Sequence, residues 1–217
     1  GLEEFMEDIL AGKPSVDASQ GISLLEGEAH DHDEHDHEEE HAHDAHEEHH
    51  HHEDDPHIWL SPANAKIMAA NICTGLSDRY PQWKTIFSTN LDDLLSRLDG
   101  LEQYGQDRLS QLSCRELITF HDGFAYFAQA FDLEILAAVK EESGSEASAK
   151  ELIELIRLAR EHQLPAIFVE QNGSTSAADI LSRDTGAKTY VLDMAMAGDS
   201  YFDAMYRNID TVKEALG

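Results

Sequence analysis

The sequence lacks any long hydrophobic run: no apolar stretch reaches the roughly 18 residues that a membrane-spanning helix needs. No secretory signal stands at its start. A helical pattern from Leu2 to Leu10 follows Gly1 at once, so we expect the sequence to begin inside a fold, as a fragment or processed chain.

Basic residues are also scarce. The chain has 15 Lys and Arg against 44 Asp and Glu, which gives a formal net charge of -29. A surface of this charge repels phosphate backbones and anionic lipids, which argues against nucleic acid and acidic membrane surfaces as partners. The same charge attracts cations and favours solubility.

Cysteine is the third scarcity, because Cys73 and Cys114 are too few for a disulfide scaffold. The sequence leaves open whether they pair or stay free. Cys73 lies on the apolar face of a helix predicted over about residues 62–80, so we interpret it as a core residue. The other members of that face are Ala69, Ile72, Leu76 and Tyr80.

Histidine is abundant in one place. Residues 26–55 hold eleven of the 14 histidines and 15 Asp and Glu, with no Lys or Arg. This composition cannot form a core and indicates a loop. A charge run of this kind is ordinarily a solvated face or an interaction tail. Because imidazole is the commonest metal ligand, we instead expect the loop to collect divalent metal at many exchangeable sites.

Strand-like and helical segments alternate from residue 115 onward, which predicts a parallel sheet covered by helices on both faces. The predicted strands are Glu116–Phe120, Glu134–Val139, Ala166–Glu170 and Lys188–Leu192. The predicted helices are Gly123–Phe131, Ser148–His162, Thr175–Thr185 and Ser200–Leu216. A long helix is predicted upstream over about residues 86–112, with Gly100 and Gly105 expected to weaken it.

Polar residues stand at three of the predicted strand ends: His121, Glu170 and Asp193. In open parallel sheets, ligands bind beyond the carboxyl ends of the strands. A histidine and a carboxylate there suit a borderline divalent metal. His57, between Pro56 and Ile58 and just before a helix start, is a further candidate ligand.

Each of these residues has a structural alternative. His121 could bond to backbone, and Asp193 could be a turn or helix-capping residue. We interpret Glu170 as a hydrogen-bonding residue rather than a ligand. His162 lies near the end of a predicted helix, where a cation suits the helix dipole, so we interpret it as structural.

Five ordered motifs cover most of the chain. They are Gly1-Leu2-Glu3, Asp55-Pro56-His57-Ile58-Trp59-Leu60-Ser61-Pro62, Thr119-Phe120-His121-Asp122-Gly123-Phe124-Ala125-Tyr126-Phe127, Ser148-Ala149-Lys150-Glu151-Leu152, and Leu192-Asp193 with Gly198-Asp199-Ser200-Tyr201. With these motifs, and with a His-rich loop before the second, the chain resembles the zinc- and manganese-binding solute-binding proteins of ABC transporters. That group includes zinc-uptake binding proteins and streptococcal metal-binding adhesin lipoproteins.

The resemblance implies an α/β fold with two lobes of parallel sheet, flanked by helices and joined by a long backbone helix. The expected division is a partial N-terminal lobe at 1–85 with the loop 26–55, a linking helix at 86–112 and a C-terminal α/β lobe at 113–217. By resemblance, His57 and His121 are metal ligands, and Asp193 is a ligand or stands beside the metal. Family members use another histidine from the first part of the N-terminal lobe, which this sequence does not contain, so we expect that lobe and the ligand set to be incomplete.

The resemblance also implies a transported ion and a partner. Manganese relatives place a carboxylate where His121 stands, and nitrogen-rich sites favour zinc, so we expect Zn²⁺, with Mn²⁺ as the alternative. The expected function is extracytoplasmic capture of Zn²⁺, in the periplasm or as a cell-surface lipoprotein, and delivery by a monomer to an ABC permease. A surface adhesin or zinc-buffering protein is the alternative. A zinc enzyme is disfavoured, because no obvious general base lies beside the ligands.

Overall fold

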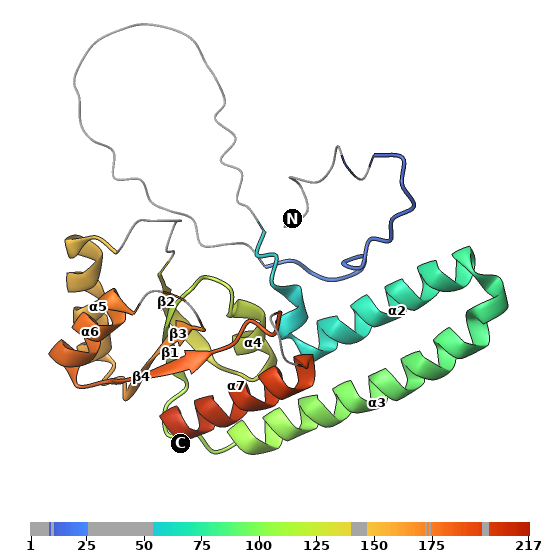
Figure 1. Ribbon diagram of the computed structural model, residues 1–217. Helices are drawn as coiled ribbons and strands as arrows, with labels where there is room; N and C mark the ends of the chain where they lie inside the picture. The colour runs from blue at the N-terminus through green and yellow to red at the C-terminus, as the bar shows by residue number, and fades with distance from the viewer. Residues whose placement is uncertain are drawn as a thin grey trace, which may run out of the picture.

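The computed structural model describes residues 9, 11–25, 54–139, 147–171, 173, 175–196 and 200–217. The helix predicted over residues 2–10, apart from Ile9, therefore lies outside the described residues. So does the His-rich loop, apart from Asp54 and Asp55. Figure 1 shows an α/β unit with a long helical hairpin reaching away from it.

The sheet contains β1 (Glu116–Phe120), β2 (Glu134–Ala138), β3 (Ala166–Glu170) and β4 (Lys188–Leu192), in the order β2-β1-β3-β4. Every pair of neighbours is parallel. The predicted α/β class and parallel sheet are confirmed, with β2 one residue shorter than expected. Parallel pairing brings the carboxyl ends of all these strands to one edge.

Each face of the sheet has its own hydrophobic core, because alternate side chains of a strand point to opposite faces. In β3, Ala166 and Phe168 belong to one core, whereas Ile167 and Val169 belong to the other. The first core is completed by α3 (Lys84–Leu109), α4 (Ala125–Ala130) and α7 (Tyr201–Leu216). The second is completed by α5 (Ala149–Glu161) and α6 (Ser176–Thr185), which lie together in Figure 1.

Local signals set where these helices start and stop. Ser148 and Glu151 form a reciprocal capping box at the start of α5. Gly186, with a φ of 81°, ends α6 in the left-handed conformation that glycine adopts without steric cost. His162 caps the end of α5, where its Nδ1 lies 3.1 Å from a Glu116 carboxylate oxygen, in agreement with its structural interpretation.

The hairpin consists of α2 (Pro62–Arg79) and α3, joined by the short 3-10 helix η3 (Pro81–Trp83). Ser61 caps α2 by accepting the N–H of Asn64 at 3.3 Å. The helix predicted over about residues 86–112 is α3, which spans Lys84–Leu109 and runs unbroken through Gly100 and Gly105. Its role as a link between two lobes stays a prediction. A Cβ at Gly105 would collide with the Phe131 ring, so this glycine lets α3 approach that aromatic side chain closely.

The predicted apolar face of α2 is not core. Ala69, Ile72, Cys73 and Leu76 line a groove of about 460 Å³ between α2 and α3, and Ile72, Leu76 and Tyr80 are exposed. Cys73 is half-buried in this groove, and both cysteines are free thiols. Within the described ranges, no helix is both long and apolar enough to cross a membrane.

Candidate metal centre

His57 stands on a firmly packed turn. It caps the 3-10 helix η2 (Ile58–Leu60), whose Ile58 and Leu60 side chains are buried. Ser61 and Pro62 then start α2 directly. The backbone around His57 is therefore held on the side away from its imidazole, and the imidazole itself is 14% exposed.

Asp55 holds the His57 side chain from behind. Its Oδ1 accepts the backbone N–H of His57 at 2.9 Å and lies 2.7 Å from the imidazole Nδ1. The Asp55 side chain is only 3% exposed, and among the described residues its Oδ2 has no hydrogen-bond partner. A buried carboxylate with so few partners attracts the N–H of its one imidazole neighbour strongly.

His121 follows β1 directly, at the sheet edge where the strand-end rule placed it. The Thr119 hydroxyl donates to its carbonyl oxygen at 3.0 Å, which fixes the turn. Glu170 ends the neighbouring strand β3, and its Oε2 lies 3.1 Å from His121 Nδ1. Glu170 thus lies within ion-pair distance of a candidate ligand, in line with its interpretation as a partner of a ligand rather than a ligand.

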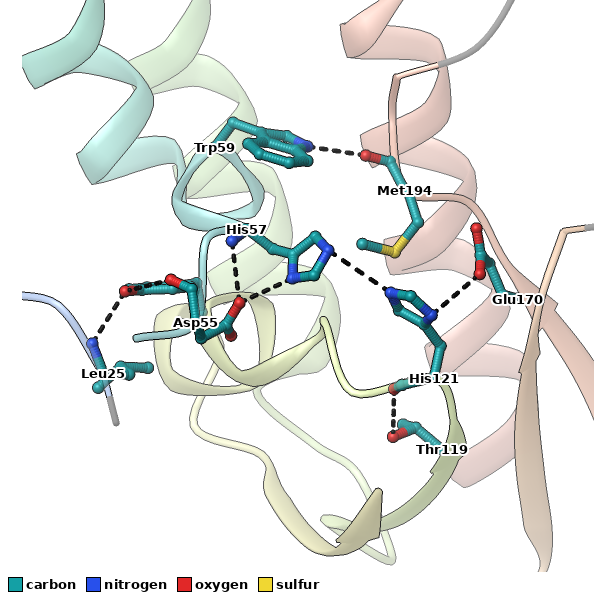
Figure 2. Close-up of polar contacts among 9 residues, drawn as sticks. Leu25, Asp55, His57, Trp59, Thr119, His121, Glu170 and Met194 are labelled. Atoms are coloured by element: carbon teal, nitrogen blue, oxygen red, sulfur yellow. Dashed lines mark hydrogen bonds and ion pairs between the residues drawn. The ribbon is translucent and has the colours of Figure 1, made fainter. Parts of the chain in front are cut away.

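The two imidazoles face each other, as Figure 2 shows. His57 Nε2 and His121 Nε2 lie 3.5 Å apart, and the ring planes cross at 78°. An ionised carboxylate only accepts hydrogen bonds, so the tautomer that suits both contacts is a neutral ring with its proton on Nδ1, facing Asp55 or Glu170. In that tautomer each Nε2 keeps a free lone pair, and the two Nε2 atoms lie 3.5 Å apart.

This separation suits a shared metal ion. Two zinc–nitrogen bonds of about 2.0–2.1 Å that start from these nitrogens meet at an angle of about 115–120°. That angle is close to what tetrahedral or trigonal coordination requires. Carboxylate partners on the far nitrogen of metal-binding histidines are a recurrent arrangement, because they fix the tautomer and raise the basicity of the ligand.

Asp193 follows β4 and is buried, but its side chain is described in contact with Ala195 and Arg207 rather than with either imidazole. Its Oδ1 accepts the N–H of Ala195 at 2.8 Å, and its Oδ2 lies 3.1 Å from an Arg207 guanidinium nitrogen. Asn208 holds its backbone on both sides. In the part of the chain that the structure describes, no three His, Cys, Asp or Glu side chains converge on one point, so Asp193 as a ligand stays a prediction.

The sequence family fits this centre. A family described as "Zinc-uptake complex component A periplasmic" matches residues 1–215. The chain belongs to this family. Its members are transport components, which confirms the expectation that the chain is not an enzyme.

Individual relatives are named for zinc or for manganese transport. The high-affinity zinc uptake system protein ZnuA of Bacillus subtilis (strain 168) is 33% identical over 209 residues, covering 93% of this chain and 63% of the relative. The manganese ABC transporter substrate-binding lipoprotein PsaA of Streptococcus mitis is 29% identical over 175 residues, covering 75% and 56%. The chain therefore spans less than two thirds of the length of either relative.

Among solved structures, a ZnuA deletion mutant with zinc bound is 28% identical to this chain. The TM-score is 0.80, and the match covers 100% of this chain and 76% of that one. The α/β arrangement in Figure 1 is thus the fold of this zinc-uptake family.

Two hydrogen bonds that the sequence did not predict clamp this centre together. The Trp59 indole N–H donates to the Met194 carbonyl at 2.8 Å, and the Tyr201 hydroxyl donates to the Trp59 carbonyl at 2.9 Å. Burial raises the pKa of the Tyr201 phenol, so it stays protonated and keeps donating. These bonds tie the turn that carries His57 to the segment after β4. The sequence placed Trp59 and Tyr201 in two of the five motifs, but gave no sign that they contact each other.

Proposed function

We propose that this protein captures Zn²⁺ outside the cytoplasm and delivers it to the membrane permease of an ABC transporter. The family description and the zinc-uptake name of the Bacillus subtilis relative support the proposal. The word lipoprotein in the streptococcal relative's name supports a place in the periplasm or at the cell surface.

One observation carries the proposal: two imidazole Nε2 atoms 3.5 Å apart, each ring held at Nδ1 by a carboxylate. With both Nδ1 atoms protonated, the two Nε2 lone pairs repel each other at this separation, and a cation between them removes that repulsion. His57 and His121 are therefore the proposed ligands.

We propose Asp193 for a third position or for a place beside the ion. Asp193 lies next to Met194, whose carbonyl accepts a hydrogen bond from the Trp59 indole. The backbone of Asp193 is thereby connected to the turn that carries His57. Each carboxylate oxygen of Asp193 accepts one described hydrogen bond, from Ala195 and from Arg207, and an oxygen has a second lone pair for a metal.

The two imidazole nitrogens of His57 and His121 favour zinc over manganese. Neutral imidazole nitrogens suit Zn²⁺, whereas Mn²⁺ prefers carboxylate, carbonyl and water oxygens. The manganese name of one relative keeps Mn²⁺ as the alternative ion.

The His-rich segment is proposed to concentrate zinc near this centre. Its two ends meet there: the Asp55 N–H donates to the Leu25 carbonyl at 2.9 Å, and Asp55 contacts His57. Metal bound by histidines between those ends stays on the same chain as the imidazole pair, which raises its effective concentration there.

The choice of ion is tested by His121→Glu in the full chain. Glutamate adds oxygen donors and a negative charge, so the ratio of the Mn²⁺ to the Zn²⁺ dissociation constant is expected to fall. Occupancy is read at the His57 ring by NMR, because residues 26–53 hold other histidines. His162→Gln, at a histidine paired with Glu116, serves as the control and should leave the ratio unchanged. An unchanged ratio in His121→Glu would contradict His121 as a ligand.

Transport is tested in cells that lose the whole protein. The proposal expects poor growth in zinc-depleted medium, repaired by added zinc and not by added manganese. Repair by manganese alone would favour the manganese alternative. Normal zinc uptake without the protein would contradict transport and favour adhesion or zinc buffering.

A further inference from the structure

A thioether lies beside the imidazole pair. Met194 follows Asp193 after β4, and the residue is 8% exposed. Its carbonyl accepts the Trp59 indole N–H, so its backbone position is fixed. Figure 2 shows its sulfur and methyl group directed toward the region where His57 and His121 face each other.

Gly123 provides a measure of this proximity. A carbon built at its Cβ position would lie 2.8 Å from His121 Nε2 and 2.8 Å from the Met194 methyl carbon. His121 Nε2 and the Met194 methyl carbon are thus both 2.8 Å from one point beside Gly123, so they are at most twice that distance apart. The Met194 thioether therefore lies close to the Nε2 atoms of His57 and His121.

The donor set that results is soft and uncharged. It comprises two imidazole nitrogens, from His57 and His121, and one thioether sulfur, from Met194. Thioether sulfur is a poor donor for Mn²⁺ and is not among the usual donors to zinc, but it selects Cu(I). The angle of about 115–120° that the two nitrogens would subtend at a metal also suits three-coordinate geometry.

We propose that His57, His121 and Met194 form a binding mode for a soft monovalent cation, Cu(I) or its analogue Ag(I), in the same centre. This rests on the proposed function insofar as it uses the same imidazole pair. Zinc would occupy the pair with oxygen donors, whereas the monovalent ion would occupy it with the sulfur. Asp55 and Glu170 serve both modes, because they hold the Nδ1 side of each ring.

The chain offers a matched control for Met194. Met196 is two residues further on, in the same segment, but the residue is 65% exposed. Replacing either residue with leucine nearly conserves volume and apolar character, and exchanges of this kind are the ones that folded proteins tolerate best. Both variants should therefore fold, and only Met194→Leu removes the sulfur near the pair.

The experiment uses the full chain with its methionine ε-methyl groups labelled with ¹³C, and silver(I) as the probe. The chain has five methionines, so each methyl signal can be assigned by substitution. The Met194 signal should shift on silver addition, the Met196 signal should not, and His57→Gln or His121→Gln should abolish the shift. Silver bound to histidines elsewhere does not affect this readout.

A second measurement follows both ions at the imidazole nitrogens of His57 and His121. Met194→Leu should raise the silver dissociation constant at the pair by about tenfold or more, while zinc changes by less than about twofold. Met196→Leu should change neither.

Three outcomes would overturn the inference: an unmoved Met194 methyl signal, a shift that persists in both histidine variants, or equal silver affinity in Met194→Leu. If zinc still binds the imidazole pair in those cases, the proposed function stands and only the soft-cation mode fails. If zinc leaves both imidazoles unperturbed, the proposed zinc function fails, whatever silver does at Met194.

Discussion

One carboxylate oxygen of Asp55 contacts two nitrogens of His57, one in the backbone and one in the imidazole. Asp55 Oδ1 lies 2.9 Å from the backbone nitrogen and 2.7 Å from the imidazole Nδ1 of the residue two positions later. The ring can neither rotate about its side-chain bonds nor exchange its tautomer without breaking one of these contacts. The motif Asp55-Pro56-His57 thus orients the His57 ring so that its Nε2 faces His121.

Asp55→Asn should weaken zinc binding at the imidazole pair by about 10–100-fold, the usual effect of losing a residue that orients a metal ligand. The amide oxygen can still accept from Nδ1, but it lacks the charge that makes the imidazole a stronger donor. Chelator competition read at the His57 ring measures the change. The exposed neighbour Asp54→Asn is the control. Equal affinities in both variants would show that Asp55 only shapes the turn.

Glu170→Gln should weaken zinc binding less than Asp55→Asn, toward the lower end of about tenfold. The Glu170 and His121 side chains are 30% and 35% exposed, so water weakens their interaction more than that of the buried pair. The same competition assay ranks the two variants. A larger effect at Glu170 would contradict the account, because burial would then not control the strength of these contacts.

Gly123→Ala should displace the His121 ring. A Cβ there would lie 2.6 Å from its Cδ2 and 2.8 Å from its Nε2, closer than such contacts allow. We expect zinc affinity to fall by about tenfold or more, as when support for a metal ligand is lost.

Gly100→Ala, in α3, is the matched control for that change, since a Cβ at this position meets no atom within 4 Å. It should leave zinc affinity unchanged and stabilise the helix by about 0.5–1 kcal/mol. Unaltered affinity in Gly123→Ala would mean that the His121 ring can move without consequence.

Tyr126→Phe should lower the free energy of unfolding by about 1–3 kcal/mol, because two backbone groups lose a partner. The Tyr126 hydroxyl accepts the Leu25 N–H at 2.9 Å and donates to the Asp55 carbonyl at 3.1 Å, in a fully buried position. Burial raises the pKa of this phenol, so the hydroxyl is present at neutral pH. Denaturant unfolding measures the loss.

The exposed Tyr80→Phe provides the comparison, since surface substitutions usually change stability by no more than about 0.5 kcal/mol. If both tyrosine variants unfold alike, the Tyr126 hydroxyl does not hold the ends of the His-rich segment together.

The sheet was predictable because its strands are short apolar runs between clear helix signals. β1, β3 and β4 have the predicted bounds, and the strand-end rule correctly placed His121 at the carboxyl edge. Family resemblance suggested His57, and the structure brings it to His121 across 64 positions of sequence.

Other features depend on distances that no local pattern encodes. The Leu25 N–H meets Tyr126 across 101 positions, and Trp59 meets Met194 across 135. The apolar spacing of α2 correctly indicated a helix, but not that its apolar side would line an open groove with Ile72 exposed. Periodicity identifies a face without identifying what covers it.

Imidazole nitrogen NMR of the full chain, titrated with less zinc than protein, tests the central claim most directly. We expect the Nε2 signals of His57 and His121 to shift first and together, while both Nδ1 atoms keep their protons for Asp55 and Glu170. His57→Gln and His121→Gln assign the signals, and each should abolish this first event. Zinc that fills the other histidines first, and leaves these two Nε2 signals unmoved, would contradict the shared site.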